Sequence, residues 1–213
     1  MRSLTIVPLV LAASLAAMAA TAQTQPPPRP SLPAPQDKPD NAPASGAVAR
    51  QRQPVQSLET LFERLHAAKS PEEAKGIATQ IQRRWSRSGS DTADLLMTRA
   101  QEAMKAKQSE IAIELLDRVV ALQPDWAEAW HQRANALFTA GDPIRALYDI
   151  GETLKREPRH YGAMMGLGII LRQQGDDKAA MAAFRKALDV YPQFEAVRKA
   201  VDSLRYDVDG RET

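Results

Sequence analysis

Three prolines at equal intervals are the feature that most constrains this chain. The interval from Pro124 to Pro158 is the same as the interval from Pro158 to Pro192. A fixed period of about 20–50 residues is typical of a protein built by stacking copies of one supersecondary unit. Aligned backwards from these prolines, the chain divides into units 93–126, 127–160 and 161–194. The sequence therefore predicts a repeat array rather than one irregular globular core.

Further positions agree among the three units. A small residue lies 24 positions before each proline: Ala100, Ala134 and Gly168. An alanine lies 12 positions before it: Ala112, Ala146 and Ala180. Gly141-Asp142 and Gly175-Asp176 separate two helical patterns, where the glycine can end one helix and the aspartate can cap the next. Each unit is therefore expected to be a pair of helices that approach closely at the small residues.

This pattern resembles the tetratricopeptide repeat family, whose repeat of about 34 residues matches the interval between the prolines. Three positions depart from it: Lys107 replaces the usual glycine of the turn, and Arg99 and Arg133 replace a leucine at position seven. The resemblance implies an all-α tetratricopeptide-repeat solenoid of antiparallel helix pairs. The whole chain also looks like a small exported bacterial protein of this family.

The two flanks of the array show helical patterns of their own. In residues 57–92, apolar residues recur at helical spacing, and Ser70-Pro71-Glu72-Glu73 is a helix-start signal. We expect a divergent helical hairpin that caps the N-terminal end of the array. Residues 195–213 are expected to be a capping helix and tail, because an apolar face is opposed by charged residues. That apolar face consists of Phe194, Val197, Val201 and Leu204.

Residues 1–22 have the pattern of a secretory signal peptide. Met1-Arg2 precedes an apolar run from Leu4 to Ala20, and Ala20-Thr21-Ala22 fits a cleavage site. The run is shorter than the roughly 20 residues that span a bilayer. We therefore expect cleavage after Ala22, a periplasmic mature protein beginning at Gln23, and no stable membrane insertion after cleavage. The alternative is that the signal is retained as a membrane anchor.

Residues 23–56 are predicted to be a disordered, Pro-rich linker. Nine of the 15 prolines of the chain lie here, and large apolar residues are almost absent. Proline removes backbone donors and favours extended conformations, so the segment cannot form a helix or a central strand. Pro27-Pro28-Arg29-Pro30 has the spacing of a ligand for aromatic grooves, but a plain spacer is the commoner use of such a segment.

Composition and motifs argue against several classes of function. Without cysteine the chain has no disulfide, thiolate metal site or cysteine nucleophile, and its three histidines are far apart in sequence. A net charge of +2 is too small to indicate nucleic-acid binding. No nucleophile, metalloprotease or phosphate-loop motif occurs. We therefore predict no enzyme activity, no cofactor, no metal and no nucleic-acid partner.

The resemblance implies a concave groove lined by the first helix of each unit, at positions two, five, nine and 12. Nine residues at these positions are our candidates for binding a protein or peptide: Met97, Gln101, Met104, His131, Asn135, Phe138, Met165, Ile169 and Arg172. The same positions also hold Asp94, Glu128 and Gly162. Relatives that clamp a peptide carboxylate use lysine at position five, where this chain has methionine in the first and third units. The resemblance therefore implies an apolar or amphipathic partner.

Two alternatives remain for this surface. Methionine surfaces adapt to varied apolar partners, but Met97, Met104 and Met165 could instead be buried against the C-terminal helix or an adjacent molecule. The chain could then be a self-associating structural module, or a membrane-tethered one if the signal is retained. Arg83, Arg84 and Arg87 are interpreted as a solvated face. The sequence favours an exported scaffold that binds a partner segment.

Overall fold

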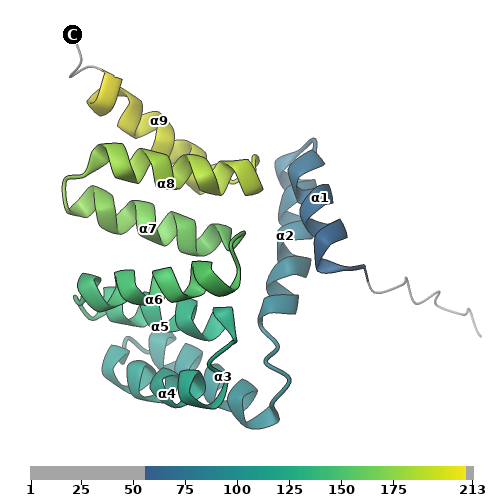
Figure 1. The fold of residues 1–213 in the computed structure, drawn as a ribbon, viewed down its shortest axis with the longest axis vertical. Coiled ribbons are helices and arrows are strands. Elements are labelled where there is room, and N and C mark those ends of the chain that lie inside the picture. The colour runs from purple at the N-terminus through teal and green to yellow at the C-terminus, as the bar shows by residue number, and fades with distance from the viewer. Residues whose placement is uncertain (1–55, 210–213) are drawn as a thin grey trace, which may run out of the picture. The chain divides into compact units, whose positions relative to one another are not determined.

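The computed structural model describes residues 56–209, and all regular structure in this range is helical (Figure 1). The predicted signal peptide and almost all of the predicted linker lie outside the described residues. In order, the helices are α1 (Leu58–Ala67), α2 (Pro71–Trp85), α3 (Asp91–Lys105), α4 (Ser109–Leu122), α5 (Ala127–Thr139), α6 (Pro143–Arg156), α7 (Tyr161–Gln173), α8 (Asp177–Val190) and α9 (Glu195–Asp209). The predicted all-α class is confirmed. Within 56–209, none of the helices is both long and apolar enough to cross a membrane.

The three predicted units appear as three helix pairs: α3 with α4, α5 with α6, and α7 with α8. The pairs follow one another in a stack, and α9 packs on α8 at its end (Figure 1). The second helices of the pairs begin at Ser109, Pro143 and Asp177, which repeat the interval between the three prolines. The alanines at the repeated positions are fully buried: Ala100, Ala112, Ala146 and Ala180 are each 0% exposed.

The turns inside the repeats have the predicted geometry. Gly141 and Gly175 adopt φ values of +84° and +82°, in the left-handed region that glycine enters without steric cost. The carboxylates of Asp142 and Asp176 cap the next helix by accepting backbone N–H bonds at 3.0 and 2.9 Å. Lys107 takes the glycine's role in the first repeat and is held at a φ of 60°.

Arg133, one of the departures from the repeat pattern, forms a two-sided ion pair. Its guanidinium donates to both carboxylate oxygens of Asp149, at 2.7 and 2.8 Å, and to Asp117 at 2.9 Å. Asp149 is on α6 of the same repeat, and Asp117 is on α4 of the preceding one. The charged residue thus joins two repeats at a position where the repeat pattern has leucine.

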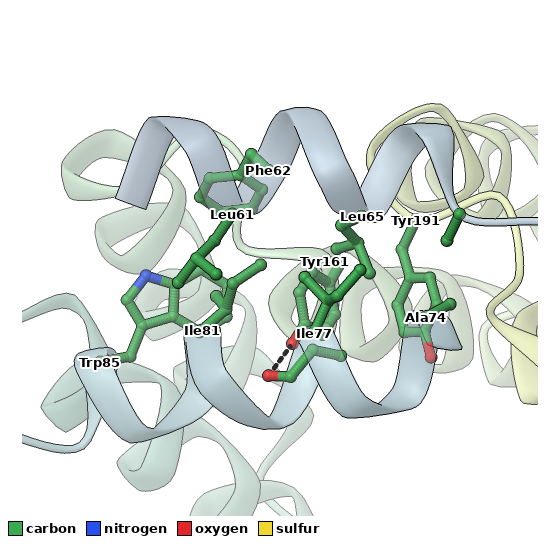
Figure 2. Close-up of a cluster of buried hydrophobic side chains, with 11 residues drawn as sticks. Leu61, Phe62, Leu65, Ala74, Ile77, Ile81, Trp85, Tyr161 and Tyr191 are labelled. Atoms are coloured by element: carbon green, nitrogen blue, oxygen red, sulfur yellow. Dashed lines mark hydrogen bonds between the residues drawn. The ribbon is translucent and has the colours of Figure 1, made fainter. Parts of the chain in front are cut away.

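The N-terminal hairpin, formed by α1 and α2, packs elsewhere than expected. We expected a cap on the first repeat, but its apolar face packs against Tyr161, at the start of α7, and Tyr191, just after α8. Figure 2 shows both tyrosines in one cluster with the apolar side chains of the hairpin. The hairpin therefore lies beside the second half of the stack (Figure 1).

Specific polar contacts fix the hairpin in this position. The Tyr161 hydroxyl donates to the Ala78 carbonyl at 3.3 Å (Figure 2), and Trp126 Nε1 donates to the Trp85 carbonyl at 2.6 Å. The Arg159 guanidinium lies 4.0 Å from the centroid of the Phe62 ring. The hairpin packs here because Tyr161, Tyr191 and Phe194 form an aromatic surface at the ends of the helices. The repeat pattern does not require these aromatic residues.

The last helix, α9, covers the end of the stack. Val197 and Leu204 are each 0% exposed and pack in the cluster that includes Phe184 of α8. On the other side of the helix, charged residues are exposed: Glu195, Arg198, Lys199, Asp202 and Arg205. The apolar residues of α9 thus remove the open end of the third repeat from water, as a solenoid cap must.

Candidate binding pocket

A pocket of about 120 Å³ lies between α5 and α7. Five of the nine candidate residues line it: His131, Asn135, Phe138, Met165 and Ile169. The other lining residues are Ala134, Ile150, Gly162, Gly166 and Ile170. The structure thus brings together the candidates of the second and third repeats, with the exception of Arg172.

Two glycines on α7 make room for this pocket. Gly162 and Gly166 are four positions apart, so both lie on the same face of the helix. A Cβ atom at Gly162 would lie 3.2 Å from His131 Nε2, and one at Gly166 would lie 3.5 Å from Ile150 Cδ1. Gly166 is not among the residues predicted from the sequence, although a pair of glycines at helical spacing is a signal that indicates it.

The pocket has apolar walls and one polar edge. Its lining includes no acidic or basic side chain other than the imidazole of His131. Asn135 is exposed, and its Nδ2 lies 3.3 Å from His131 Nε2. Burial and the nearby His160 lower the pKa of His131 to about 4, although Glu128 acts to raise it. His131 is therefore neutral at pH 7, and the pocket carries no net charge of its own.

Four other candidates lie away from this pocket. Contrary to the prediction that it faces the groove, Met97 is only 3% exposed and packs in the core with Ala93 and Ala100. The small alanines of this repeat leave space that a long, flexible methionine fills. Gln101, Met104 and Arg172 do not line the pocket, and Met104 packs partly against the same core.

Glu128, which the repeat position also places in the groove, is instead buried. It forms hydrogen bonds with Gln82, Gln132 and His160, and these four side chains are called the buried joint. Glu128 is 2% exposed. Its Oε1 accepts hydrogen bonds from Gln132 Nε2 at 2.6 Å and from Gln82 Nε2 of α2 at 3.1 Å. Its Oε2 lies 3.1 Å from His160 Nε2. Both carboxylate oxygens are thus satisfied inside the protein.

His160 completes this joint. Its Nδ1 accepts the backbone N–H of Ala163 at 3.1 Å and so caps α7, which leaves the proton on Nε2 to be donated to Glu128. Burial acts to raise the pKa of Glu128, but the hydrogen bond from His160 and the charges nearby outweigh it and lower that pKa below 4.5. Histidine is not among the usual capping residues, so no sequence signal pointed to this role.

The joint links the hairpin to the pocket. The Trp85 ring of α2 stacks on the His160 ring, with 4.2 Å between centroids and an interplanar angle of 9°. The centroid of the His131 ring lies 4.3 Å from that of the same His160 imidazole. Because His131 lines the pocket, a continuous chain of ring contacts runs from α2 to the pocket wall.

Known proteins resemble this chain over the repeats and beyond them. The tetratricopeptide repeat family matches residues 97–152 and 131–193. A TPR repeat-containing protein of Rhizobium etli is 37% identical over 160 residues, which cover 75% of this chain and 78% of that protein. Among solved structures, the Sgt2 TPR domain from Aspergillus fumigatus has a TM-score of 0.55 at 20% identity, covering 58% of this chain and 83% of that one.

A second solved structure has the same fold. The Yersinia enterocolitica type III secretion chaperone SycD, solved in complex with a peptide of the translocator YopD, has a TM-score of 0.54 at 15% identity. The match covers 58% of this chain and 97% of that one. At these identities the solved structures establish the fold alone, whereas the Rhizobium relative establishes the family. The chain therefore belongs to the tetratricopeptide repeat family.

Proposed function

We propose that this protein is a scaffold that binds a segment of a partner protein in the pocket between α5 and α7. The observation that carries the proposal is the pocket itself: an apolar hollow lined by residues of two adjacent repeats, on the helices that the family uses for its groove. The SycD structure, which holds a translocator peptide, supports the proposal because the same fold there holds a segment of another protein.

The chemistry of the pocket favours an apolar or amphipathic segment over a charged tail. Met165 and Ile169 occupy positions five and nine, at which relatives with a carboxylate clamp carry lysine and asparagine or arginine, and no lysine or arginine lines the pocket. A carboxylate would enter without a charged partner, which is costly in a partly desolvated site. Apolar side chains lose no hydrogen bonds to water on entering, and they release water from the walls.

Replacing Phe138 tests the proposal. Phe138→Ala should weaken capture of the partner by roughly 1–3 kcal/mol, because aromatic side chains dominate binding where water is excluded. Partners would be cross-linked in cells, identified by mass spectrometry, and titrated against the purified wild-type and variant chains. Tyr148→Ala is the matched control, because Tyr148 is 63% exposed and does not line the pocket.

The outcomes separate binding from packing. If Phe138→Ala lowers the melting temperature and leaves capture unchanged, Phe138 is a core residue and the pocket proposal fails. If light scattering instead shows a dimer that Phe138→Ala dissociates, the occupant is a second copy of the chain. A partner whose binding collapses between low and moderate salt would also contradict an apolar contact.

We further propose that the protein is exported and acts in the periplasm after cleavage behind Ala22. The support is the sequence alone: a basic start, a short apolar run and Ala20-Thr21-Ala22. The intact mass of the exported protein should correspond to a chain that begins at Gln23. Recovery of the full-length chain in the membrane fraction would mean that the signal is retained as an anchor.

A further inference from the structure

We infer that the pocket between α5 and α7 takes one uncharged aliphatic side chain, that of a leucine or a methionine, from the bound segment. The inference rests on the proposed function and goes further by naming which side chain the partner presents. Three features of the described residues carry it: the volume of the pocket, the composition of its walls, and the polar group at its rim.

The volume excludes larger occupants. At about 120 Å³, the pocket is well below the roughly 300–1,000 Å³ of sites for drug-sized ligands and cofactors. An engineered apolar cavity of about 150 Å³ binds benzene. A leucine or methionine side chain has four non-hydrogen atoms, against six in benzene, and its flexible chain fits this smaller hollow. The indole of a tryptophan is larger than benzene and does not.

The walls select for an uncharged occupant. Phe138, Met165 and Ile169 form apolar walls, and Ile150 and Ile170 lie deeper, each no more than 3% exposed. None of the lining residues is acidic, lysine or arginine. Desolvating a carboxylate or an ammonium group here would cost free energy with no opposite charge to offset it. Methionine can also adapt its side chain to the shape of the occupant.

The rim provides a contact for the peptide backbone. Asn135 is exposed at the edge of the pocket, one turn of α5 after His131. Its amide has both donor and acceptor atoms, so it can hydrogen-bond a peptide N–H or C=O while the side chain of the same residue enters the hollow. The expected epitope is therefore a leucine or methionine whose neighbouring peptide N–H and C=O groups are available for hydrogen bonds.

Capped amino acids test this epitope without knowledge of the partner. The probes are N-acetyl-leucinamide and N-acetyl-methioninamide, compared with N-acetyl-tryptophanamide and N-acetyl-aspartamide, and the readout is NMR of the chain labelled at its methionine methyl groups. The first two probes should shift the NMR resonance of the Met165 methyl group. The titration should give a dissociation constant of roughly 1 mM, as expected for such small ligands. Met97 and Met181, each 3% exposed in the core, should not shift.

Glycine variants show whether the probe enters this pocket. Gly166→Leu should fill the hollow and abolish the Met165 shift, and Gly166→Ala should weaken binding by a smaller factor, because its Cβ meets only Ile150 Cδ1 at 3.5 Å. Gly151→Leu is the matched control, since no atom lies within 4 Å of a Cβ at that site on α6. Circular dichroism would verify that each variant keeps its helices.

Three results would overturn the inference. The first is an equal Met165 shift from all four probes. The second is a shift that survives Gly166→Leu. The third is a change in the NMR resonance of the Met165 methyl on Leu32→Ala with no probe present. Leu32 is the one leucine of the predicted linker, residues 23–56, and it would then be the occupant. If these arise while partner capture still depends on Phe138, the proposed function stands and only the identity of the inserted residue is wrong.

Discussion

At the scale of single residues, the small side chains of the repeat set how closely the two helices of a pair approach. In the third repeat, a Cβ atom at Gly168 of α7 would lie 2.5 Å from Cε1 of Phe184 on α8. The Phe184 ring is 1% exposed, and the close packing of protein interiors opposes its displacement. The aromatic ring of one helix thus occupies the space that a side chain on the other would need.

Gly168→Ala should therefore destabilise the protein by about 1–3 kcal/mol, despite the better helix propensity of alanine. Gly151→Ala on α6 is the matched control: a Cβ there meets no atom within 4 Å, so the substitution should stabilise by roughly 0.5–1 kcal/mol. Urea denaturation of both variants measures the difference. The same sign of change at both positions would show that the contact with Phe184 does not limit the approach.

At the scale of elements, the hairpin of α1 and α2 depends on the repeats for its stability. Two short helices are marginal in water by themselves, so their apolar face must be covered. Here it is covered by Tyr161 and Tyr191, which are far from it in sequence. Burial raises the pKa of both tyrosines, as expected for hydroxyl groups withdrawn from water.

Removing the ring of Trp85 should release this hairpin. Trp85→Ala deletes the contacts with Phe62, His160 and Tyr161, and such a loss costs about 3–5 kcal/mol. Hydrogen exchange should therefore accelerate by roughly 100-fold or more in α1 and α2 while α3 and α4 change little. The exposed aromatic Tyr148, replaced by alanine, is the control. Equal acceleration in all helices would mean that the hairpin and the repeats unfold as one unit.

The sequence predicted the repeats well because their information is local and repeated. The period, the small residues such as Ala180, and caps such as Ser70, whose Oγ accepts the N–H of Glu73 at 3.2 Å, follow from spacing alone. The docking of the hairpin could not be predicted in this way. It depends on Tyr161, which has no aromatic counterpart in the other units and acquires its meaning only when distant segments meet.

The candidate site could be predicted only in part for a related reason. Position in the repeat correctly brought Phe138, Met165 and Ile169 together, because neighbouring repeats present equivalent positions side by side. The same rule placed Met97 and Glu128 on the surface, whereas both are buried. Whether such a side chain faces solvent depends on the volume of its neighbours and on what packs over it, and a repeat pattern specifies neither.

At the scale of the whole molecule, the buried joint connects segments that the repeat pattern treats as separate. Gln82 belongs to α2 of the hairpin and Glu128 to α5 of the second repeat, and His160, the last residue of that repeat, caps α7 of the third. A buried carboxylate is tolerated only while its hydrogen bonds are complete, so opening any one of these contacts weakens the other two. The joint therefore makes the hairpin and the last two repeats cooperate in unfolding.

This joint and the neighbouring His131 should make the stability of the whole molecule sensitive to acid. The pKa of His131 is lowered from 6.5 to about 4 in the folded protein, so between these values the unfolded chain binds more protons than the folded one. The free energy of unfolding should therefore fall by up to about 3 kcal/mol as the pH decreases from 6.5 to 4. The pKa of Glu128 is also lowered, and the stability that it contributes is present above 4.5 and lost as the pH falls through its folded value.

Urea denaturation between pH 7.5 and 4 measures this dependence, and His131→Leu separates the two groups. The variant has no imidazole to protonate at this position, so its stability should change less between pH 6.5 and 4.5, while the further loss below 4.5 that comes from Glu128 remains. An unchanged slope of stability against pH in His131→Leu would place the acid sensitivity elsewhere in the chain. Because His131 lines the pocket, protonating it in the folded protein would put a positive charge beside the bound side chain, so partner binding should weaken as the pH falls through about 4.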